Sequence, residues 1–233
     1  VALRSALTDR WAGPPVAMVI ALWLLRVWRG VLRPAAGGLV PTALAERLPG
    51  QWDAGALASA RETFALHRPG AAAGKISLTS ILLLVLSLGL GVASHIAWDL
   101  FTHIDRWGLL AWPALAENWG PLAGYKWLQY GSTVIGLLIG GVGGLWWLAR
   151  RRPGPVSGRA RAYVRVCWWV SLPAFLVVAW FGGLAIYGPL RPGFGVEHLA
   201  YLVLPPTVGL WGALTLLLAI VLQLTRRAAV RAR

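Results

Sequence analysis

The chain has 233 residues, of which 58% are hydrophobic and only 13% charged, and its mean hydropathy is +0.64. These values lie outside the usual range of soluble globular domains and indicate that the chain is solvated by a lipid bilayer. The formal net charge of +14 comes from arginines that flank apolar segments, so we expect no nucleic-acid partner. The single cysteine, Cys167, excludes a disulfide framework and a cysteine-based metal motif.

Five apolar runs are long enough to cross a membrane, since a helical span needs roughly 20 residues. Helices satisfy their own backbone groups in lipid, so we predict an all-α, polytopic transmembrane helical bundle that forms one multi-pass domain over residues 1–233. The predicted spans are residues 13–32, 77–101, 131–149, 165–188 and 200–224. The first run is followed by Arg26, Arg29 and Arg33 where a signal peptide would have a small-residue cleavage site, so we interpret it as a retained helix.

Residues 33–75 form the connection after the first span. This stretch is richer in proline, glycine and charge than the spans, and "PTALAERL" (41–48) is compatible with a short surface helix. We find no repeat in it, and we predict that it is cytoplasmic.

The second apolar run ends in the polar stretch "SHIAWDLFTH" (94–103), which holds two of the four histidines. On a helix, His95, Asp99 and His103 share a stripe about 80° wide. His95 and Asp99 lie about 6 Å apart along the axis, which two side chains can bridge to hold one metal ion, whereas His103 lies about 12 Å from His95. Two interpretations remain open: a metal site at a membrane face, or a helix end that meets the interface. Ser94 and His95 point about 100° apart, which argues against a serine nucleophile.

Residues 102–130 form the next connection, which we predict to be outside the membrane and rich in tryptophan. Trp107, Trp112, Trp119 and Trp127 stand there among glycines and prolines. This pattern is typical of an interfacial aromatic belt, and the alternative is a lid over the polar cluster.

Positive charge concentrates on one predicted side of the membrane. Six arginines lie in or beside the connection between the third and fourth spans, and four follow the fifth. The positive-inside rule then places the C-terminus in the cytoplasm and the N-terminus outside. The outer side keeps five of the 22 Lys and Arg residues, namely Arg4, Arg10, Arg106, Lys126 and Arg191.

The same topology places Glu197 and His198, just before the fifth span, on the outer side with His95 and Asp99. Zinc usually takes three protein ligands, and one helix face supplies two good ones. We therefore treat His95 and Asp99 as metal-ligand candidates, with His103, Glu197 and His198 as weaker ones. The expected cofactor is a divalent metal such as zinc.

Two motifs resemble a bacterial integral-membrane family known as domain of unknown function 4184. They are "GVASHIAWDLFTHIDRWG" (91–108) followed by "YKWLQYGSTVIGLL" (125–138), and "VLRPAAGGLVPTALAERL" (31–48) resembles an earlier segment of that family. The family is distantly similar to membrane-bound metal-dependent hydrolases, in which an "SHxxxD" element contributes ligands. The resemblance thus implies metal binding by His95 and Asp99. Family members also carry a Thr-His-Ser element before the first matched span, where this chain has "LRSALTDRW" (3–11), so we expect these upstream ligands to be missing or to lie in a preceding segment.

Two functions follow from these patterns. The first is a multi-pass inner-membrane protein with an outward metal pocket that acts on a phosphoester or lipid-linked substrate through metal-activated water. The second is a non-catalytic membrane scaffold or transport accessory protein, whose polar cluster only orders the outer end of the bundle. The lipid bilayer is the one partner that the sequence indicates.

Overall fold

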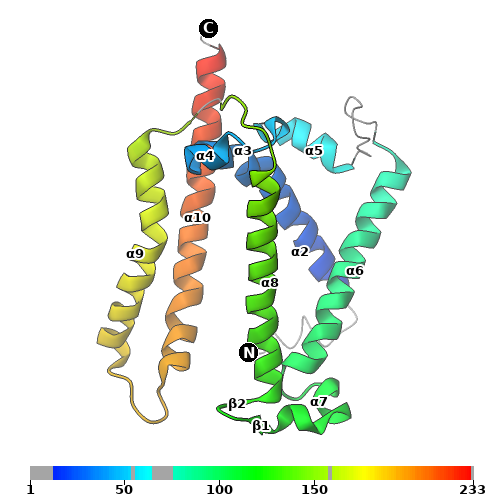
Figure 1. The fold of residues 1–233 in the computed structure, drawn as a ribbon, viewed down its shortest axis with the longest axis vertical. Helices are drawn as coiled ribbons and strands as arrows, with labels where there is room; N and C mark the ends of the chain where they lie inside the picture. The colour runs from blue at the N-terminus through cyan, green and yellow to red at the C-terminus, as the bar shows by residue number, and fades with distance from the viewer. Residues whose placement is uncertain (1–12, 54–55, 65–75, 157–158, 232–233) are drawn as a thin grey trace. The chain divides into compact units, whose positions relative to one another are not determined.

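The computed structural model describes residues 13–53, 56–64, 76–156 and 159–231 (Figure 1). The N-terminal stretch 3–11 and His67 lie outside the described residues. The elements in chain order are α2 (Gly13–Val27), the π-helical η1 (Trp28–Leu32), α3 (Arg33–Leu39), α4 (Thr42–Ala45), the 3-10 helix η2 (Gly50–Asp53), α5 (Ala56–Phe64), α6 (Leu78–Thr102), α7 (Trp107–Ala111), the 3-10 helix η3 (Pro113–Ala116), β1 (Asn118–Trp119), β2 (Leu122–Ala123), α8 (Gly124–Ala149), α9 (Ala162–Tyr187) and α10 (Val196–Arg231).

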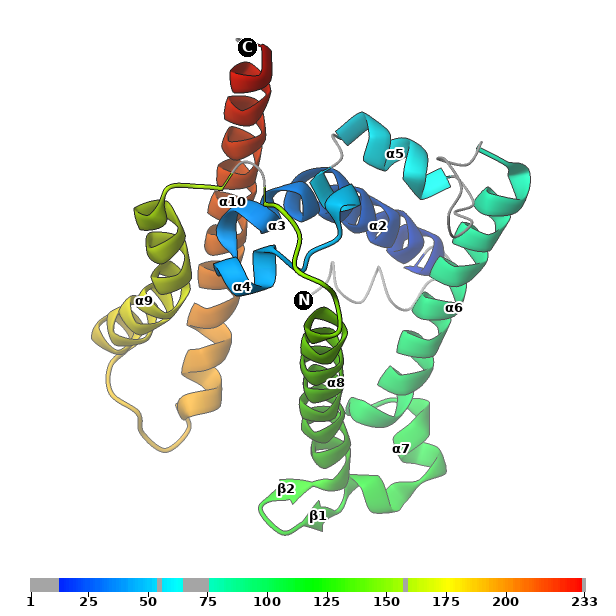
Figure 2. The same ribbon diagram turned by 45° about the horizontal axis from the view of Figure 1, so that its top comes forward.

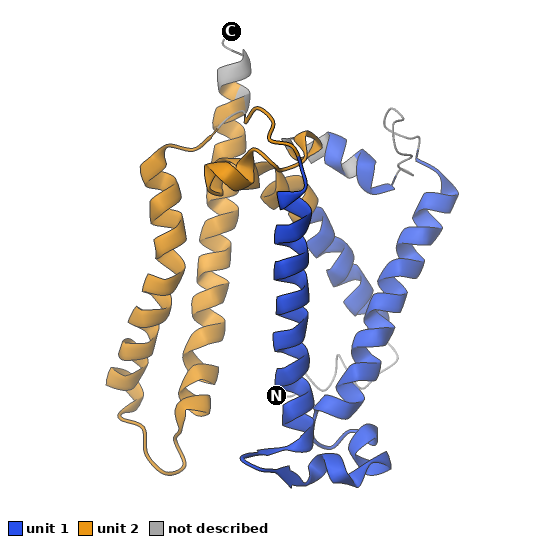
Figure 3. Ribbon diagram, viewed as in Figure 1, with its two compact units in different colours: residues 1–27, 57–151 blue, residues 28–56, 152–233 orange. Residues whose placement is uncertain are grey.

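Five of the described helices are long and apolar enough to cross a membrane, which confirms the predicted all-α transmembrane fold. Their bounds are Gly13–Leu39, Leu78–Thr102, Gly124–Ala149, Ala162–Tyr187 and Val196–Arg226. Large apolar side chains remain exposed along all five helices, as expected of surfaces that lipid covers. The chain divides into two compact units, residues 1–27 with 57–151 and residues 28–56 with 152–233 (Figure 3).

Unit 1 contains α2, α6 and α8. The Ser77 hydroxyl caps α6 by accepting a hydrogen bond from the backbone N–H of Ser80, at 3.1 Å. Near the other end of α6, the indole N–H of Trp98 donates to the Ser132 hydroxyl on α8, at 3.2 Å. This bond fixes the C-terminal end of α6 beside the N-terminal end of α8, and these two ends carry the polar cluster described below.

The connection between α6 and α8 is ordered by short elements rather than by one long loop. β1 and β2 form a two-stranded antiparallel hairpin in which Asn118 pairs with Ala123. The indole N–H of Trp119 donates to the Ala114 carbonyl, and that of Trp127 donates to the Trp119 carbonyl. Trp107, Trp112, Trp119 and Trp127 are between 44% and 65% exposed. Exposed indole rings, two of which have their N–H groups bonded within the connection, favour the aromatic-belt interpretation over a closed lid.

Unit 2 is built on the helical hairpin of α9 and α10, which run side by side in both views (Figures 1 and 2). Gly183 allows a close approach, because a Cβ placed there would lie 2.7 Å from Val203 Cγ1 and 2.8 Å from Leu199 Cδ1. Two indole N–H groups bond across the hairpin: Trp168 donates to Thr215 at 3.1 Å and Trp211 to Ser171 at 2.9 Å.

The first predicted span continues to Leu39 as helix, beyond the end that apolar composition marks at residue 32. Pro34 has no N–H, so the carbonyl of Gly30, four residues earlier, lacks its helical donor. The Gln223 amide from α10 replaces that donor, bonding the Gly30 and Val31 carbonyls at 3.3 and 2.9 Å. A bond from a distant helix thus supports a segment that composition assigned to a loop.

Candidate functional site

The polar cluster lies at the C-terminal end of α6, where His95 and Asp99 share one face of the last two turns and His103 is the extended C-cap residue. His95 Nε2 is 3.5 Å from Asp99 Oδ2, and His103 Nδ1 is 3.7 Å from Asp99 Oδ1. Each carboxylate oxygen therefore faces one imidazole. Both distances exceed the range of a good hydrogen bond, so the three groups lie close without being locked together.

The cluster is accessible. The His95 side chain is 75% exposed, that of Asp99 37% and that of His103 47%. A ligand or metal can therefore reach both imidazoles without any rearrangement of the helix. Asp105, three residues after the last residue of α6, has a positive φ of 60°, a conformation that aspartate tolerates better than most residues.

Two further residues position His103. The Thr102 hydroxyl lies 3.2 Å from its Nδ1, and Gln129 Nε2 lies 3.4 Å from its Nε2. Thr102 is 2% exposed, so that contact is held in a packed position. Gln129 belongs to α8 and lies 26 residues from His103 in sequence, and the Trp98 to Ser132 bond ties the same two helices.

Sequence reasoning did not assign Gln129 to the site. The available signal was the joint occurrence of the "SHIAWDLFTH" and "YKWLQYGST" motifs, the second of which contains Gln129. The two motifs together indicated the family resemblance. They also mark the two helix ends that the structure brings together.

The structure brings together His95, Asp99 and His103 in unit 1. Glu197 and His198 belong to unit 2, in the first turn of α10, where both are exposed. They line a separate hollow with Phe194, whose ring centroid lies 6.3 Å from that of His198. Throughout the part of the chain that the structure describes, no group of three or more His, Cys, Asp or Glu side chains is placed to hold one metal ion.

Helices of this length and composition define a multi-pass membrane protein. The chain belongs to the family described as Domain of unknown function (DUF4184), whose profile matches residues 2–222. The resemblance seen in the sequence motifs is thereby confirmed. No curated protein and no solved structure matched the chain.

Proposed function

We propose that this protein is a bacterial inner-membrane hydrolase-like protein whose outward polar cluster binds a divalent metal through His95 and Asp99. The observation that carries the proposal is the Asp99 carboxylate with one oxygen turned to each imidazole. The substrate class is a phosphoester or a lipid-linked compound, because the cluster lies at the end of a membrane helix.

The donor atoms fit zinc in type and spacing. Zinc takes imidazole nitrogen at about 2.0–2.1 Å and carboxylate oxygen at about 2.0–2.2 Å, so two donors of one tetrahedral ion lie about 3.3–3.5 Å apart. The separation of 3.5 Å between His95 and Asp99 matches that value, and 3.7 Å between His103 and Asp99 is slightly longer. Two donors do not close a coordination shell, and His103, 3.7 Å from Asp99, is the next candidate ligand within unit 1.

The roles of the chain's own residues follow from this pairing. His95 and Asp99 would hold the metal, while Gln129 and Thr102 contact the ring nitrogens of His103. The second oxygen of Asp99 faces His103, so this histidine can orient the carboxylate or exchange a proton with a bound substrate. A bound metal would supply Lewis acidity and an activated water.

We also propose that the N-terminus is outside and the C-terminus cytoplasmic. The support is that the predicted inner segments carry most of the Lys and Arg residues. Such charge determines orientation most strongly when it lies in short loops. Arg150 and Arg151 stack on Trp146 and Trp147, with guanidinium carbons 3.8 and 5.0 Å from the ring centroids. Such pairs are typical of residues anchored at a membrane interface.

A second candidate function is a non-catalytic scaffold or transport accessory protein. The observation that favours it is that no ligand set of three forms within the described residues. In that case the cluster only orders the ends of α6 and α8.

Metal analysis of the full chain, purified in detergent, separates the two functions. For the hydrolase-like protein we expect about one equivalent of metal per chain, lost in His95→Ala and in Asp99→Asn. Glu117→Gln removes an exposed carboxylate of the outer connection and serves as the matched control, which should keep the metal. Hydrolysis of a model phosphodiester should follow the metal content. If the wild-type protein lacks stoichiometric metal, or His95→Ala keeps it, the metal proposal is wrong and the scaffold function stands.

A further inference from the structure

Three arginines from separate segments of unit 2 lie in α3 or beside it. Arg33 lies within this helix and is 7% exposed. Arg226 of α10 donates through Nη1 to the Pro34 carbonyl, at 2.9 Å. The backbone N–H of Ala160 donates to the Gly38 carbonyl at 3.2 Å, which brings the neighbouring Arg159 to the same helix. The fold therefore concentrates positive charge where little of it is hydrated.

Arg159 has hydrogen-bonding capacity that the described residues do not use. Its Nε and Nη2 atoms are shielded from solvent and have no hydrogen-bond partner among the described residues. Guanidinium donors shielded from water are costly unless an acceptor meets them. A phosphate offers several acceptor oxygens in a geometry that matches the guanidinium fork. Phosphate is thus the chemistry that this cluster fits.

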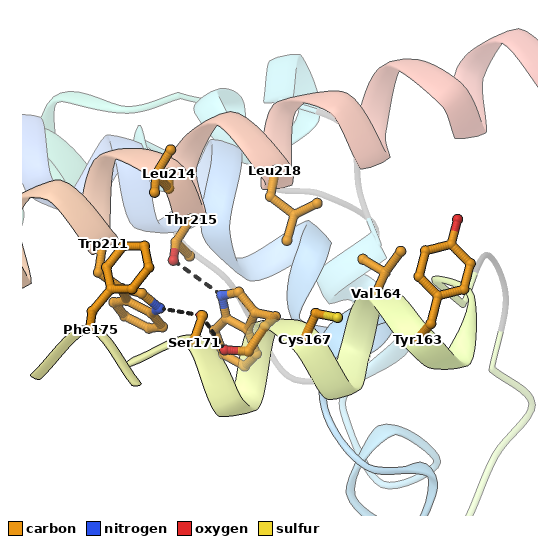
Figure 4. A pocket seen from close by; sticks show the side chains of 10 residues that line it. Tyr163, Val164, Cys167, Ser171, Phe175, Trp211, Leu214, Thr215 and Leu218 are labelled. Carbon is orange, nitrogen blue, oxygen red and sulfur yellow. Dashed lines mark hydrogen bonds between the residues drawn. The ribbon is translucent and has the colours of Figure 1, made fainter. Parts of the chain in front are cut away.

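A groove runs along the hairpin of α9 and α10 from the same end of unit 2 (Figure 4). It extends from Tyr163 to Phe175 on α9 and from Leu218 to Trp211 on α10, with a volume of about 330 Å³. Twelve residues of helix rise about 18 Å. One leaflet contributes about half of the 30 Å hydrocarbon core, so the groove is about as long as one leaflet is deep.

The groove wall is mostly apolar, although it contains two tryptophans and two hydroxyl groups besides that of Tyr163 at its mouth. The rings of Trp168 and Trp211 lie 5.5 Å apart at 30°, and their N–H groups bond to Thr215 and Ser171 (Figure 4). These hydrogen bonds satisfy the two indole N–H groups and involve the hydroxyls of Thr215 and Ser171. The side chain that opens the groove, Tyr163, is 61% exposed, so hydrocarbon can enter from the bilayer.

The basic cluster and the groove lie on neighbouring stretches of the same two segments. Tyr163 follows Arg159 by four residues, and Arg165 bonds back to the Ala160 carbonyl at 3.1 Å, which holds this segment against the start of α9. On α10, Arg226 follows Thr215 by eleven residues, which is within about 20° of three full turns. Arg226 and the groove residue Thr215 therefore share a helix face.

We propose that unit 2 binds an anionic phospholipid, with its phosphate on Arg159, Arg33 and Arg226 and one acyl chain in the groove between α9 and α10. In the topology proposed above, this is the cytoplasmic leaflet, whose anionic lipids are drawn to basic segments beside membrane helices. The proposal does not depend on a metal at Asp99.

Native mass spectrometry of the full chain in detergent tests the proposal. The probes are phosphatidylglycerol and phosphatidylcholine with identical acyl chains. We expect the protein to retain phosphatidylglycerol in preference, and Arg159→Gln to weaken that retention about tenfold, as expected for the loss of a charge-assisted hydrogen bond. Arg150→Gln is the matched control, because it removes the same charge from unit 1 at a residue that stacks on Trp146. It should bind like the wild type.

A second variant tests the acyl chain separately from the phosphate. Leu218→Trp fills the groove without changing charge, and it should also weaken retention of phosphatidylglycerol. Equal retention of both lipids by the wild type would overturn the proposal, as would an equal effect of Arg159→Gln and Arg150→Gln. If Leu218→Trp binds normally while inorganic phosphate displaces the lipid at equal concentration, the cluster is a free-anion site and the lipid proposal is wrong.

Discussion

The close approach of α9 and α10 at Gly183 gives a sharp prediction for Gly183→Ala. The added Cβ would lie 2.7 Å from Val203 Cγ1 and 2.8 Å from Leu199 Cδ1, whereas carbon atoms in contact prefer about 3.5–4.0 Å. Either the backbone at Gly183 or the side chains of Val203 and Leu199 must therefore move by about 1 Å.

Both neighbours of Gly183 are buried. Leu199 is 0% exposed and Val203 is 7% exposed. Val203 is also β-branched, so its side chain has essentially one rotamer on a helix. Overpacking of this kind costs about 1–3 kcal/mol, and we expect Gly183→Ala to lower the free energy of unfolding by that amount.

Gly182→Ala is the matched control for this prediction. A Cβ at Gly182 would meet nothing within 4 Å, so the substitution should be neutral or stabilise the helix by up to about 1 kcal/mol. Equilibrium unfolding in mixed micelles, followed by circular dichroism, measures the difference. In a Val203→Ala background the cost of Gly183→Ala should shrink. Equal effects at positions 182 and 183 would refute the close packing.

Two further predictions concern the topology and the indole hydrogen bonds. In a Cys167→Ser background, a membrane-impermeant maleimide applied to intact cells should modify Pro192→Cys and spare Val156→Cys, and the reverse labelling would invert the proposed orientation. Because Trp211 donates to Ser171 at 2.9 Å, Trp211→Phe and Ser171→Ala should show a coupling energy of about 0.6 kcal/mol in a double-mutant unfolding cycle, and additive effects would mean that the bond contributes nothing.

The number and type of the long helices were predictable because the bilayer imposes them. Any run of about 20 apolar residues must form a helix in lipid, and this rule alone identified all five. Composition does not locate helix ends, because it marks only the hydrocarbon depth. α8 begins at Gly124 and continues through polar residues such as Lys126 and Gln129, which resemble a loop by composition.

The candidate site was only partly predictable. The spacing of His95 and Asp99 placed them on one stripe because helical geometry is local, whereas His103, predicted on the same stripe, is the extended C-cap residue after the helix ends. The contact of His103 with Gln129 joins residues 26 apart, and periodicity carries no information about such a pairing. The burial of Arg33 was equally inaccessible, since arginine in a connection is expected in solvent and only tertiary packing covers it.

The depth of Asp99 decides which measurement can reveal its role. Asp99 lies 21 residues after the start of α6, a rise of about 32 Å, so a helix that begins at one edge of the 30 Å hydrocarbon core brings this residue to the other edge. An aspartate at the bilayer centre costs about 2.5–3.5 kcal/mol, but the cost falls toward the interface. Lipid therefore neither forbids the carboxylate nor requires a partner for it, and Asp99→Asn should change stability little. A loss of bound metal without a loss of stability would thus identify Asp99 as a ligand, because the position makes no other strong demand on that side chain.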